Sequence, residues 1–226
     1  MAGMSVLSDP ALQARIDALQ ANSVAQEAET NRYFGERARK GDLDWDALDD
    51  AANAFMADKM VALEPVKAEF CAMLCRALRA KRVVEIGTSF GVSTLYLADA
   101  VRANGGGTVI ATEYEPAKAA QARANFAAAR VSDLIDLREG DLRETLRVIE
   151  GPVDFVLMDI WTEMARPAME LVHPHLRPGA IVVADNTGEF FRHSYRHFFA
   201  FVNDPANGLK TMTLPFQGGL ELVVKV

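Results

Sequence analysis

Residues 83–94 read VVEIGTSFGVST, and the fold of the chain depends on what this stretch is. An apolar run, Val83 to Ile86, leads directly into a segment with glycines at 87 and 91 and then into a helical pattern. A strand followed by a glycine-rich turn that opens a helix is typical of a cofactor loop. The pentapeptide Gly87-Thr88-Ser89-Phe90-Gly91 also fits G-x-S-x-G, in which Ser89 would be the nucleophile of a serine hydrolase. The remaining sequence has to separate these interpretations.

Downstream of this stretch, short apolar strands alternate with helical segments. Strands are predicted over residues 82–86, 108–112, 134–137, 153–158 and 180–184, with helices over 92–101, 116–129, 142–149, 166–176 and 194–202. This alternation predicts an α/β fold in which a parallel sheet carries helices on both faces. Two further apolar runs, 209–214 and 220–226, flank a Pro- and Gly-containing turn. The seven-stranded sheet is therefore expected to end in an antiparallel hairpin.

The first eighty residues show helical patterns and no alternating strand pattern. Asp9-Pro10 is typical of a helix start, and polar residues around Asn22 and at Gly41-Asp42 are expected to break the pattern. Further helices are predicted from Trp45 to about Asp58 and from Pro65, the latter with apolar residues Val66, Phe70, Met73, Leu74 and Leu78 at helical spacing. We expect a single domain over residues 1–226, with N-terminal helices over 1–80 and a cofactor-binding core over 81–226.

Composition restricts the classes of function. The 226 residues carry 24 basic and 31 acidic side chains, a net charge of −7, which argues against a protein that binds nucleic-acid phosphates. No signal peptide and no apolar run near the ~20 residues of a membrane span is visible. The two cysteines, Cys71 and Cys75, cannot form a disulfide framework and are expected to lie in the core. The sequence predicts a cytoplasmic location.

Two enzyme classes compete for the glycine segment and fit it poorly. A serine hydrolase could draw on Asp159 or Asp185 and on a later histidine, but its nucleophile elbow follows a central strand, whereas Ser89 follows the first strand. A nicotinamide-dependent dehydrogenase needs G-x-G-x-x-G, and this loop has only Gly87 and Gly91.

Acidic residues at successive strand ends favour a different ligand. Glu85 lies at the end of the first strand, Glu113 ends the second and Asp141 follows the third. The carboxyl ends of parallel strands line one crevice, where open α/β sheets bind ligands. A ligand with an ammonium group, a ribose diol and an exocyclic amine would satisfy all three carboxylates, and S-adenosylmethionine has these groups. Glycines at 87 and 91 would let the backbone approach it closely.

With these motifs the sequence resembles the class I S-adenosylmethionine-dependent methyltransferases, and more narrowly the catechol O-methyltransferase type. Val84-Glu85-Ile86-Gly87 through Gly91 resembles the first cofactor loop of that family. Met158-Asp159-Ile160-Trp161 resembles its Leu-Asp-His-Trp segment, and Ala184-Asp185-Asn186 repeats its Ala-Asp-Asn. The resemblance covers nearly the whole chain and implies a Rossmann-like methyltransferase sheet with N-terminal helices that cover the cofactor.

The resemblance also implies the site residues. The expected S-adenosylmethionine contacts are Leu63, Glu85, Gly87, Thr88, Ser89, Gly91, Ser93, Glu113, Tyr114, Asp141, Leu142, Asp159 and Trp161, with Lys67 beside the methionine end. Asp159, Asp185 and Asn186 would hold Mg²⁺ or a similar divalent cation, for which hard oxygen donors are suitable ligands. That metal would lower the pKa of an acceptor hydroxyl and orient its oxygen toward the methyl group. Trp161 would also form a wall of the acceptor pocket.

One departure from the family concerns the catalytic base. Where the catechol-type enzymes place a lysine three residues after the first aspartate, this chain has Thr162, whose hydroxyl is too weak a base near neutral pH. Three alternatives remain open: the metal alone ionises the substrate, His193 takes the proton, or the substrate is not a catechol. The predicted catalytic set is therefore Asp159, Thr162 and His193, with Thr162 lining the acceptor site.

The sequence thus predicts an O-methyltransferase acting on a small, aromatic, catechol-like hydroxyl compound with divalent-metal assistance. The alternatives are a metal-independent small-molecule methyltransferase and a non-catalytic S-adenosylmethionine-binding protein. A small-molecule acceptor is the expected partner, nucleic acid and membrane are not, and a homodimer stays open.

Overall fold

The computed structural model describes residues 5–226, in which three helices precede an α/β core. The helices are α1 (Pro10–Lys40), α2 (Asp50–Met56), α3 (Pro65–Ala77), α4 (Val92–Ala103), α5 (Pro116–Ala128), α6 (Leu142–Thr145), α7 (Thr162–Val172) and α8 (Arg196–Val202). The strands are β1 (Arg82–Ile86), β2 (Thr108–Glu113), β3 (Ile135–Glu139), β4 (Val153–Met158), β5 (Leu176–Asp185), β6 (Leu209–Leu214) and β7 (Leu220–Lys225).

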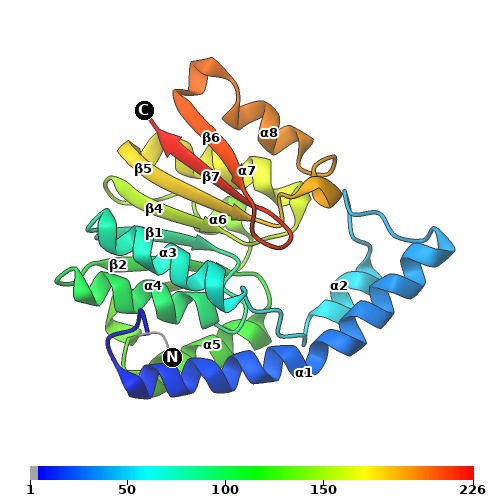
Figure 1. Cartoon of the computed structure of the whole chain (residues 1–226), viewed down its shortest axis with the longest axis horizontal. Helices are drawn as coiled ribbons and strands as arrows, with labels where there is room; N and C mark the ends of the chain where they lie inside the picture. Colours follow the sequence, from blue (N-terminus) through cyan, green and yellow to red (C-terminus); the bar gives the residue numbers. More distant parts are fainter. Residues whose placement is uncertain (1–4) are drawn as a thin grey trace.

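The described strands form one seven-stranded sheet in the order β3-β2-β1-β4-β5-β7-β6 (Figure 1). Strands β1 to β5 pair in parallel, whereas β7 runs antiparallel to both β5 and β6. The chain leaves β1 toward β2 and β3, and later returns to place β4 on the other side of β1. The expected Rossmann-like methyltransferase sheet with a terminal antiparallel hairpin is confirmed, and its topological switch point lies between β1 and β4.

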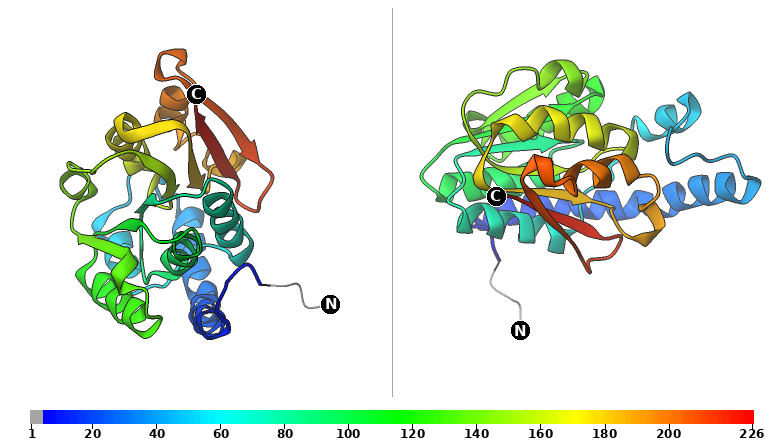
Figure 2. Two further views of the ribbon diagram at one scale, coloured as in Figure 1. Left: turned by 90° about the vertical axis from the view of Figure 1, so that its left-hand side faces the viewer. Right: turned by 90° about the horizontal axis from the view of Figure 1, so that it is seen from above.

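Helices cover both faces of the sheet (Figures 1 and 2). Helices α1, α3, α4 and α5 pack with Val83 and Leu157 into one apolar cluster. Helices α7 and α8 pack with Val84 and Ile86 into a second cluster on the opposite face. Neighbouring residues of β1 thus point to opposite faces, as the period-2 geometry of a strand requires.

Helix α1 is longer than the sequence indicates. Asp9 caps it by accepting from the Ala11 amide, and Gly41 ends it in the left-handed conformation with φ +70°, which confirms the predicted start and end. The predicted break around Asn22 is wrong: Asn22 is exposed on a continuous helix, because polar residues on the solvent side contain no helix breaker. Ser23 is buried beside it, donating to the Met60 carbonyl and accepting from the Ala62 amide, each at 3.0 Å.

The C-terminal half of α1 and the antiparallel α2 extend past the core as an arm (Figures 1 and 2). Phe34, Ala52 and Met56 form a small apolar cluster inside it, with Trp45 packed against them. Helix α2 begins at Asp50 instead of Trp45, because Asp49 caps it by accepting from the Ala52 amide. Residues 41–49 are therefore a loop, called the arm loop below.

Helix α3 buries the predicted face only in part: Phe70, Leu74 and Leu78 pack against the core. Val66 and Met73 are 56% and 51% exposed, whereas the buried residues are Lys67, Ala68, Cys71, Ala72 and Cys75. Small side chains fill this face, where α3 packs with α4 against the sheet. The core position of both cysteines is confirmed, and the helix turns one lysine inward.

Candidate active site

The candidate site lies where the carboxyl ends of four parallel strands meet. Ile86 of β1 pairs with Thr112 of β2 on one side and with Met158 of β4 on the other. Met158 in turn pairs with Ala184 of β5. Asp159 and Asp185 each follow a member of this last pair, so the two aspartates end neighbouring strands, which in sheets lie about 4.8 Å apart.

The glycine loop is shaped by the packing of the chain itself. Gly87 has φ +93°, and a Cβ there would lie 2.0 Å from the Asp159 carbonyl oxygen. Gly91 has φ +85°, and a Cβ there would lie 2.3 Å from the ring of Phe126. Glycine is therefore required at both positions before any ligand is considered.

Glu85 is fully buried beneath this loop. Its Oε2 accepts from the hydroxyl of Thr88 at 3.1 Å and from the hydroxyl of Thr94. Within residues 5–226, no group donates to the other oxygen, Oε1, although it too is buried. Burial raises the pKa of Glu85 to about 7, and the hydroxyls of Thr94, Ser93 and Thr88 oppose that rise. A buried carboxylate oxygen without a donor is suited to a cationic ligand group.

Glu113 is held by backbone amides at the end of β2. Ser89 donates its amide to Oε2 at 2.6 Å, and Glu115 donates its amide to Oε1 at 2.8 Å. Ser89 makes this contact with φ +49°, which turns its amide toward the carboxylate. Each oxygen has a further lone pair, so the carboxylate can accept from a diol while it stays fixed. Tyr114, next along the chain, is 69% exposed.

Asp141 lies at the third strand end, as predicted, but it already has a cationic partner. It caps α6 by accepting from the Arg143 amide at 2.8 Å, and the Arg143 guanidinium donates to both of its carboxylate oxygens. Side-chain hydrogen bonding from Arg143 holds the pKa of Asp141 below its ordinary value. Leu142, which follows, is partly buried against the apolar cluster under α7.

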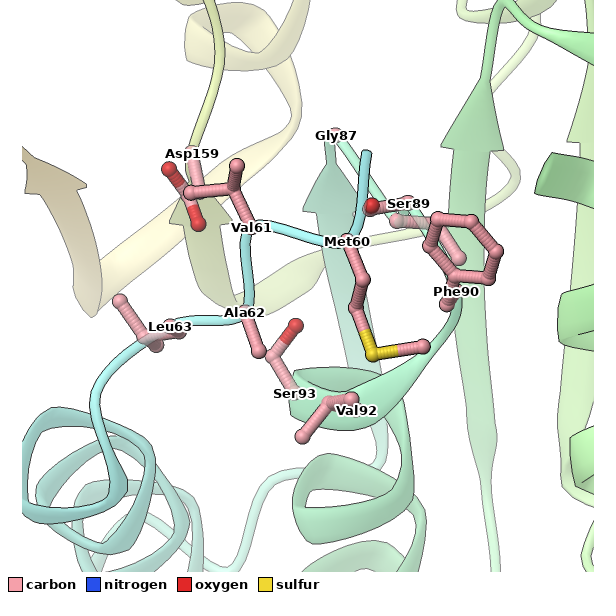
Figure 3. A pocket seen from close by; sticks show the side chains of 11 residues that line it. Met60, Val61, Ala62, Leu63, Gly87, Ser89, Phe90, Val92, Ser93 and Asp159 are labelled. Carbon is pink, nitrogen blue, oxygen red and sulfur yellow. The ribbon is translucent and has the colours of Figure 1, made fainter. Parts of the chain in front are cut away.

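A narrow pocket joins the glycine loop to an N-terminal segment (Figure 3). It is lined by Met60–Leu63, Gly87–Phe90, Val92, Ser93 and Asp159. Helix α1 holds the segment in place, since Gln20 donates to the Leu63 carbonyl at 2.9 Å and Ser23 to that of Met60. Six predicted cofactor contacts thus line one pocket: Leu63, Gly87, Thr88, Ser89, Ser93 and Asp159.

The predicted metal ligands are Asp159, which also lines the pocket, and the residues Asp185 and Asn186 at the end of the neighbouring strand. Asp185 is 5% exposed, Asp159 is half-buried, and Asn186 is exposed with φ +57°. Burial raises the pKa of Asp159 to about 8; the charge of Asp185 adds to the rise and the ammonium of Lys67 opposes it. Burial also raises the pKa of Asp185. Two carboxylates so placed concentrate negative charge.

The donor set suits a hard divalent cation. No cluster of three or more His, Cys, Asp or Glu side chains that could hold a metal occurs within residues 5–226. The predicted set has two carboxylates and one amide oxygen, an all-oxygen combination that Mg²⁺ accepts alongside water. These residues therefore pass this test of donor chemistry.

The ammonium group of Lys67, on α3, lies beside the predicted metal ligand Asp185. Its side chain is 2% exposed, and its Nζ lies 2.7 Å from Asp185 Oδ1 and 3.4 Å from Glu64 Oε2. Tyr195 fixes the backbone on the other side, because its hydroxyl donates to the Asp185 carbonyl at 2.9 Å. Burial raises the pKa of Tyr195, so its hydroxyl stays a donor.

Thr162, the first residue of α7, connects that helix to the arm loop. Its hydroxyl donates to the Trp45 carbonyl at 2.6 Å. The Trp45 ring lies edge-on to Phe191, with ring centroids 5.2 Å apart, and Asp46 pairs with Arg196 at 2.5 Å. The arm loop is thereby fastened to the segment that follows β5.

The remaining predicted residues lie at the surface of this side. Trp161 is 38% exposed at the start of α7, as a pocket wall can be. His193 is exposed close to Asp46, and no ring hydrogen bond to Asp159 or Asp185 occurs in the part of the chain that the structure describes. Beside them, η3 (Glu189–Phe191) and the turn between β6 and β7 enclose an open groove of about 550 Å³.

Several contacts at the site could not be read from motifs. The burial of Lys67 against Asp185 went unpredicted, although its spacing from Cys71 and Cys75 matches one helix face. Tyr195 and Trp45 carry no motif, because the groups that they contact lie ten or more residues away in the sequence.

Comparisons with known proteins agree with this geometry. A family model described as a methyltransferase domain matches residues 84–187. A catechol O-methyltransferase of Mycobacterium tuberculosis is 35% identical over 127 residues, which make up 56% of this chain and 57% of that protein. A catechol O-methyltransferase of Niastella koreensis is 32% identical over 151 residues, covering 62% of this chain and 66% of that protein. The chain therefore spans less than two thirds of the length of these curated relatives.

Solved structures extend the match to the fold. The cofactor-bound crystal structure of Rv0187 from MTB superposes with a TM-score of 0.67 at 27% identity, over 78% of this chain and 90% of that one. The sheet order, the matched domain and these relatives together make the chain similar to class I S-adenosylmethionine-dependent O-methyltransferases over its α/β core.

Proposed function

We propose that this protein transfers the methyl group of S-adenosylmethionine to a hydroxyl of a small, aromatic, catechol-like acceptor, with assistance from a divalent cation. One observation carries the proposal: Asp159 lines the glycine-loop pocket and also ends the strand beside Asp185. A single residue thus joins a cofactor pocket to an anionic, oxygen-rich cluster. In that arrangement the methyl donor and the acceptor oxygen would meet at Asp159.

The cofactor side supplies three different acceptors. The buried Oε1 of Glu85, which has no hydrogen-bond donor among the described residues, would accept from the ammonium group of the methionine part. Glu113, fixed by the amides of Ser89 and Glu115, would accept from the ribose hydroxyls. Asp141 would face the adenine amine, with Arg143 holding its carboxylate in place. Leu63 and Ser93 would close the pocket around the methionine chain.

The acceptor side supplies ligands and walls. Asp159, Asp185 and Asn186 would hold Mg²⁺, which when bound lowers the pKa of a coordinated hydroxyl. The residues of the chain then orient the acceptor: Trp161 as an aromatic wall, and Thr162 by fastening the arm loop beside it. The Thr162 hydroxyl donates a hydrogen bond to the Trp45 carbonyl, so it acts as an anchor and does not serve as the base. His193 stays the predicted alternative base.

A metal-independent methyltransferase is the second candidate, and one contact favours it. Lys67 already places a positive charge 2.7 Å from Asp185, where a cation is needed. A protein that binds the cofactor without turnover is the third candidate. Removal of divalent cations separates the first two, and product formation excludes the third.

Other properties of the protein follow the same proposal. The acceptor is a small molecule, since the site is a pocket with a groove of modest size beside it. Across residues 5–226, no helix has the length and apolar character needed to cross a bilayer. The cytoplasmic location, the homodimer and the single-domain assignment stay predictions of the sequence.

The proposal is tested by a mass-spectrometric product screen. The purified protein is incubated with S-adenosylmethionine and a panel of catechols and monophenols, either with Mg²⁺ or with EDTA. We expect catechols to gain the mass of one methylene with Mg²⁺ and to remain unmodified with EDTA. Equal product in both arms would support the metal-independent candidate. Cofactor binding without product from any acceptor would contradict the enzymatic function.

A further inference from the structure

Lys67 is the buried cation of the acceptor side, and it lies among the predicted metal ligands. Its Nζ donates to Asp185 Oδ1 at 2.7 Å, and its side chain is 2% exposed. A Cβ built on Gly218 would lie 3.3 Å from Asn186 Oδ1 and 3.7 Å from Lys67 Nζ, so both atoms border the same small space. The ammonium also opposes the rise in the pKa of Asp159. Lys67 therefore contacts the predicted ligand Asp185 and borders the same space as the predicted ligand Asn186.

A second carboxylate stands one helical turn before Lys67. Glu64 Oε2 lies 3.4 Å from Nζ, and the Glu64 side chain is 40% exposed. Glu64 precedes Pro65 at the start of α3 and makes no side-chain capping contact, so its carboxylate is available to the ammonium. Lys67 thus has one close, buried partner and one more distant, hydrated partner.

An ammonium and a divalent cation that both contact the Asp185 carboxylate repel each other. Their repulsion is strong at a few ångströms in a medium of low effective dielectric constant. An ammonium that leaves Asp185 without another partner would remain buried and unpaired, which is costly. Glu64 offers that partner without any movement of the α3 backbone.

We propose that Lys67 competes with the divalent cation for Asp185, and that Glu64 receives the ammonium when the cation binds. Before the cation binds, Lys67 holds the Asp185 carboxylate in place and offsets its charge. When the cation binds, the Lys67 ammonium turns to Glu64 and keeps its proton, so no proton is released by this step. Lys67 is a positioning residue that weakens cation affinity and keeps the cation exchangeable. This inference rests on the proposed metal site.

The geometry argues against a role for Lys67 as the missing catalytic base. An ammonium that donates to a carboxylate has no lone pair with which to accept a proton. Lys67 therefore does not replace, as catalytic base, the lysine that the family has at the position of Thr162.

The test measures cation affinity without turnover. Mn²⁺ is titrated into the full-length protein, with free Mn²⁺ followed by electron paramagnetic resonance and with neither cofactor nor acceptor present. We expect Lys67→Met to bind Mn²⁺ at least about tenfold more tightly than the wild type, because one nearby positive charge is lost. Lys81→Met is the matched control: it removes the same charge just before β1, at the opposite end of that strand, and should leave the affinity unchanged.

Glu64 provides a second, independent arm. Glu64→Gln should weaken Mn²⁺ binding about threefold in the wild type, because the displaced ammonium has a poorer partner. In the Lys67→Met background the same substitution should change little, since there is no ammonium to receive. Glu64 has a partly exposed side chain, so this variant tests the inference even if Lys67→Met fails to fold.

Three results would overturn the inference. These are an unchanged or weaker affinity in folded Lys67→Met, an equal effect of Glu64→Gln in both backgrounds, and no Mn²⁺ binding by either protein. The last result would remove the metal site as well. The product screen described above would then show whether methyl transfer itself survives, so the two failures can be told apart.

Discussion

The two halves of the candidate site are built in different ways. On the cofactor side, the carboxylates are held by groups close in the sequence: Glu113 by amides of residues 89 and 115, and Glu85 by the hydroxyls of Thr88 and Thr94. On the acceptor side, contacts join distant segments. Lys67 and Asp185 are 118 residues apart, and Trp45 and Thr162 are 117 apart.

This difference separates binding from chemistry. The cofactor side combines β1, β2 and the glycine loop with Asp159 and the segment Met60–Leu63, which α1 holds in place. The acceptor side is complete only when α3 and the arm loop have docked onto the core. Changes on one side should therefore leave the other nearly intact, and each prediction below tests that independence.

The largest effect is expected at Asp185. Asp185→Asn keeps the backbone carbonyl that Tyr195 holds, but it removes the charge of one of the two predicted anionic ligands. We expect methyl transfer to fall about a hundredfold or more, while the affinity for S-adenosylhomocysteine changes little. Product formation and calorimetric titration measure the two quantities. Asp204→Asn, at the surface before η4 (Pro205–Asn207), is the control. A fall of less than about threefold would show that the acceptor side needs no charge at this position.

Glu85 should show the opposite pattern of effects. Glu85→Gln presents an amide to the hydroxyls that now donate to it, and it removes the charge that would meet the ligand ammonium. We expect a loss of about 1.5–3 kcal/mol in cofactor binding, roughly tenfold to a hundredfold in affinity. Glu139→Gln, which loses a surface ion pair with Arg123, is the control. Unchanged cofactor affinity would place the ammonium elsewhere.

Glu85 also makes the stability of the ligand-free protein depend on pH. Its pKa is about 7 in the folded chain against an ordinary value of 4.5. Between these values the folded state holds a proton that the unfolded state has lost, so the free energy of unfolding falls as the pH rises. We expect melting temperatures to fall through this window in the wild type and to fall less in Glu85→Gln. An equal slope in both proteins would assign the dependence to other groups.

Thr162 should have a smaller effect, limited to the acceptor. Thr162→Val removes the hydrogen bond to the arm loop, a loss of about 0.5–1.5 kcal/mol. We expect KM for the acceptor to rise about threefold to tenfold, with kcat and cofactor affinity nearly unchanged. Thr30→Val, which removes a comparable hydroxyl contact within α1, is the control. If kcat instead fell about a hundredfold, Thr162 would be a catalytic residue.

The smallest effect is expected at Ser89, the central residue of the G-x-S-x-G match. Its backbone amide, and not its hydroxyl, contacts Glu113, and Ser89→Ala retains that amide. We expect cofactor affinity to fall by less than about threefold, since the remaining change is a single, partly buried hydroxyl. Complete loss of activity would revive the serine hydrolase interpretation.

The sequence predicted the parts of the structure whose causes are local. The strands and the glycine loop follow from alternating apolar runs and from Gly87 and Gly91, and the carboxylates appear at the ends of their strands. From the sequence we interpreted these glycines as giving room for a ligand. In the structure a side chain at either position would already collide with Asp159 or Phe126.

Contacts between distant segments could not be predicted in the same way. A lysine in α3 has no local sign of its partner on β5, and the helix face was predicted from Val66 and Met73, which are exposed. The small residues Ala68, Cys71 and Ala72 are buried in their place, and this turns Lys67 inward. The packing of α3 against the core therefore determines that the Lys67 ammonium lies beside the Asp185 carboxylate.

Titration calorimetry with and without Mg²⁺ tests the central claim, the separation of the two halves, most directly. S-adenosylhomocysteine is titrated first, and a catechol is then titrated into the cofactor-saturated protein, each with Mg²⁺ and after EDTA treatment. We predict that cofactor affinity is the same in both conditions, and that the catechol binds with Mg²⁺ but not after EDTA treatment. Equal catechol binding in both conditions, or cofactor binding that requires Mg²⁺, would contradict the account.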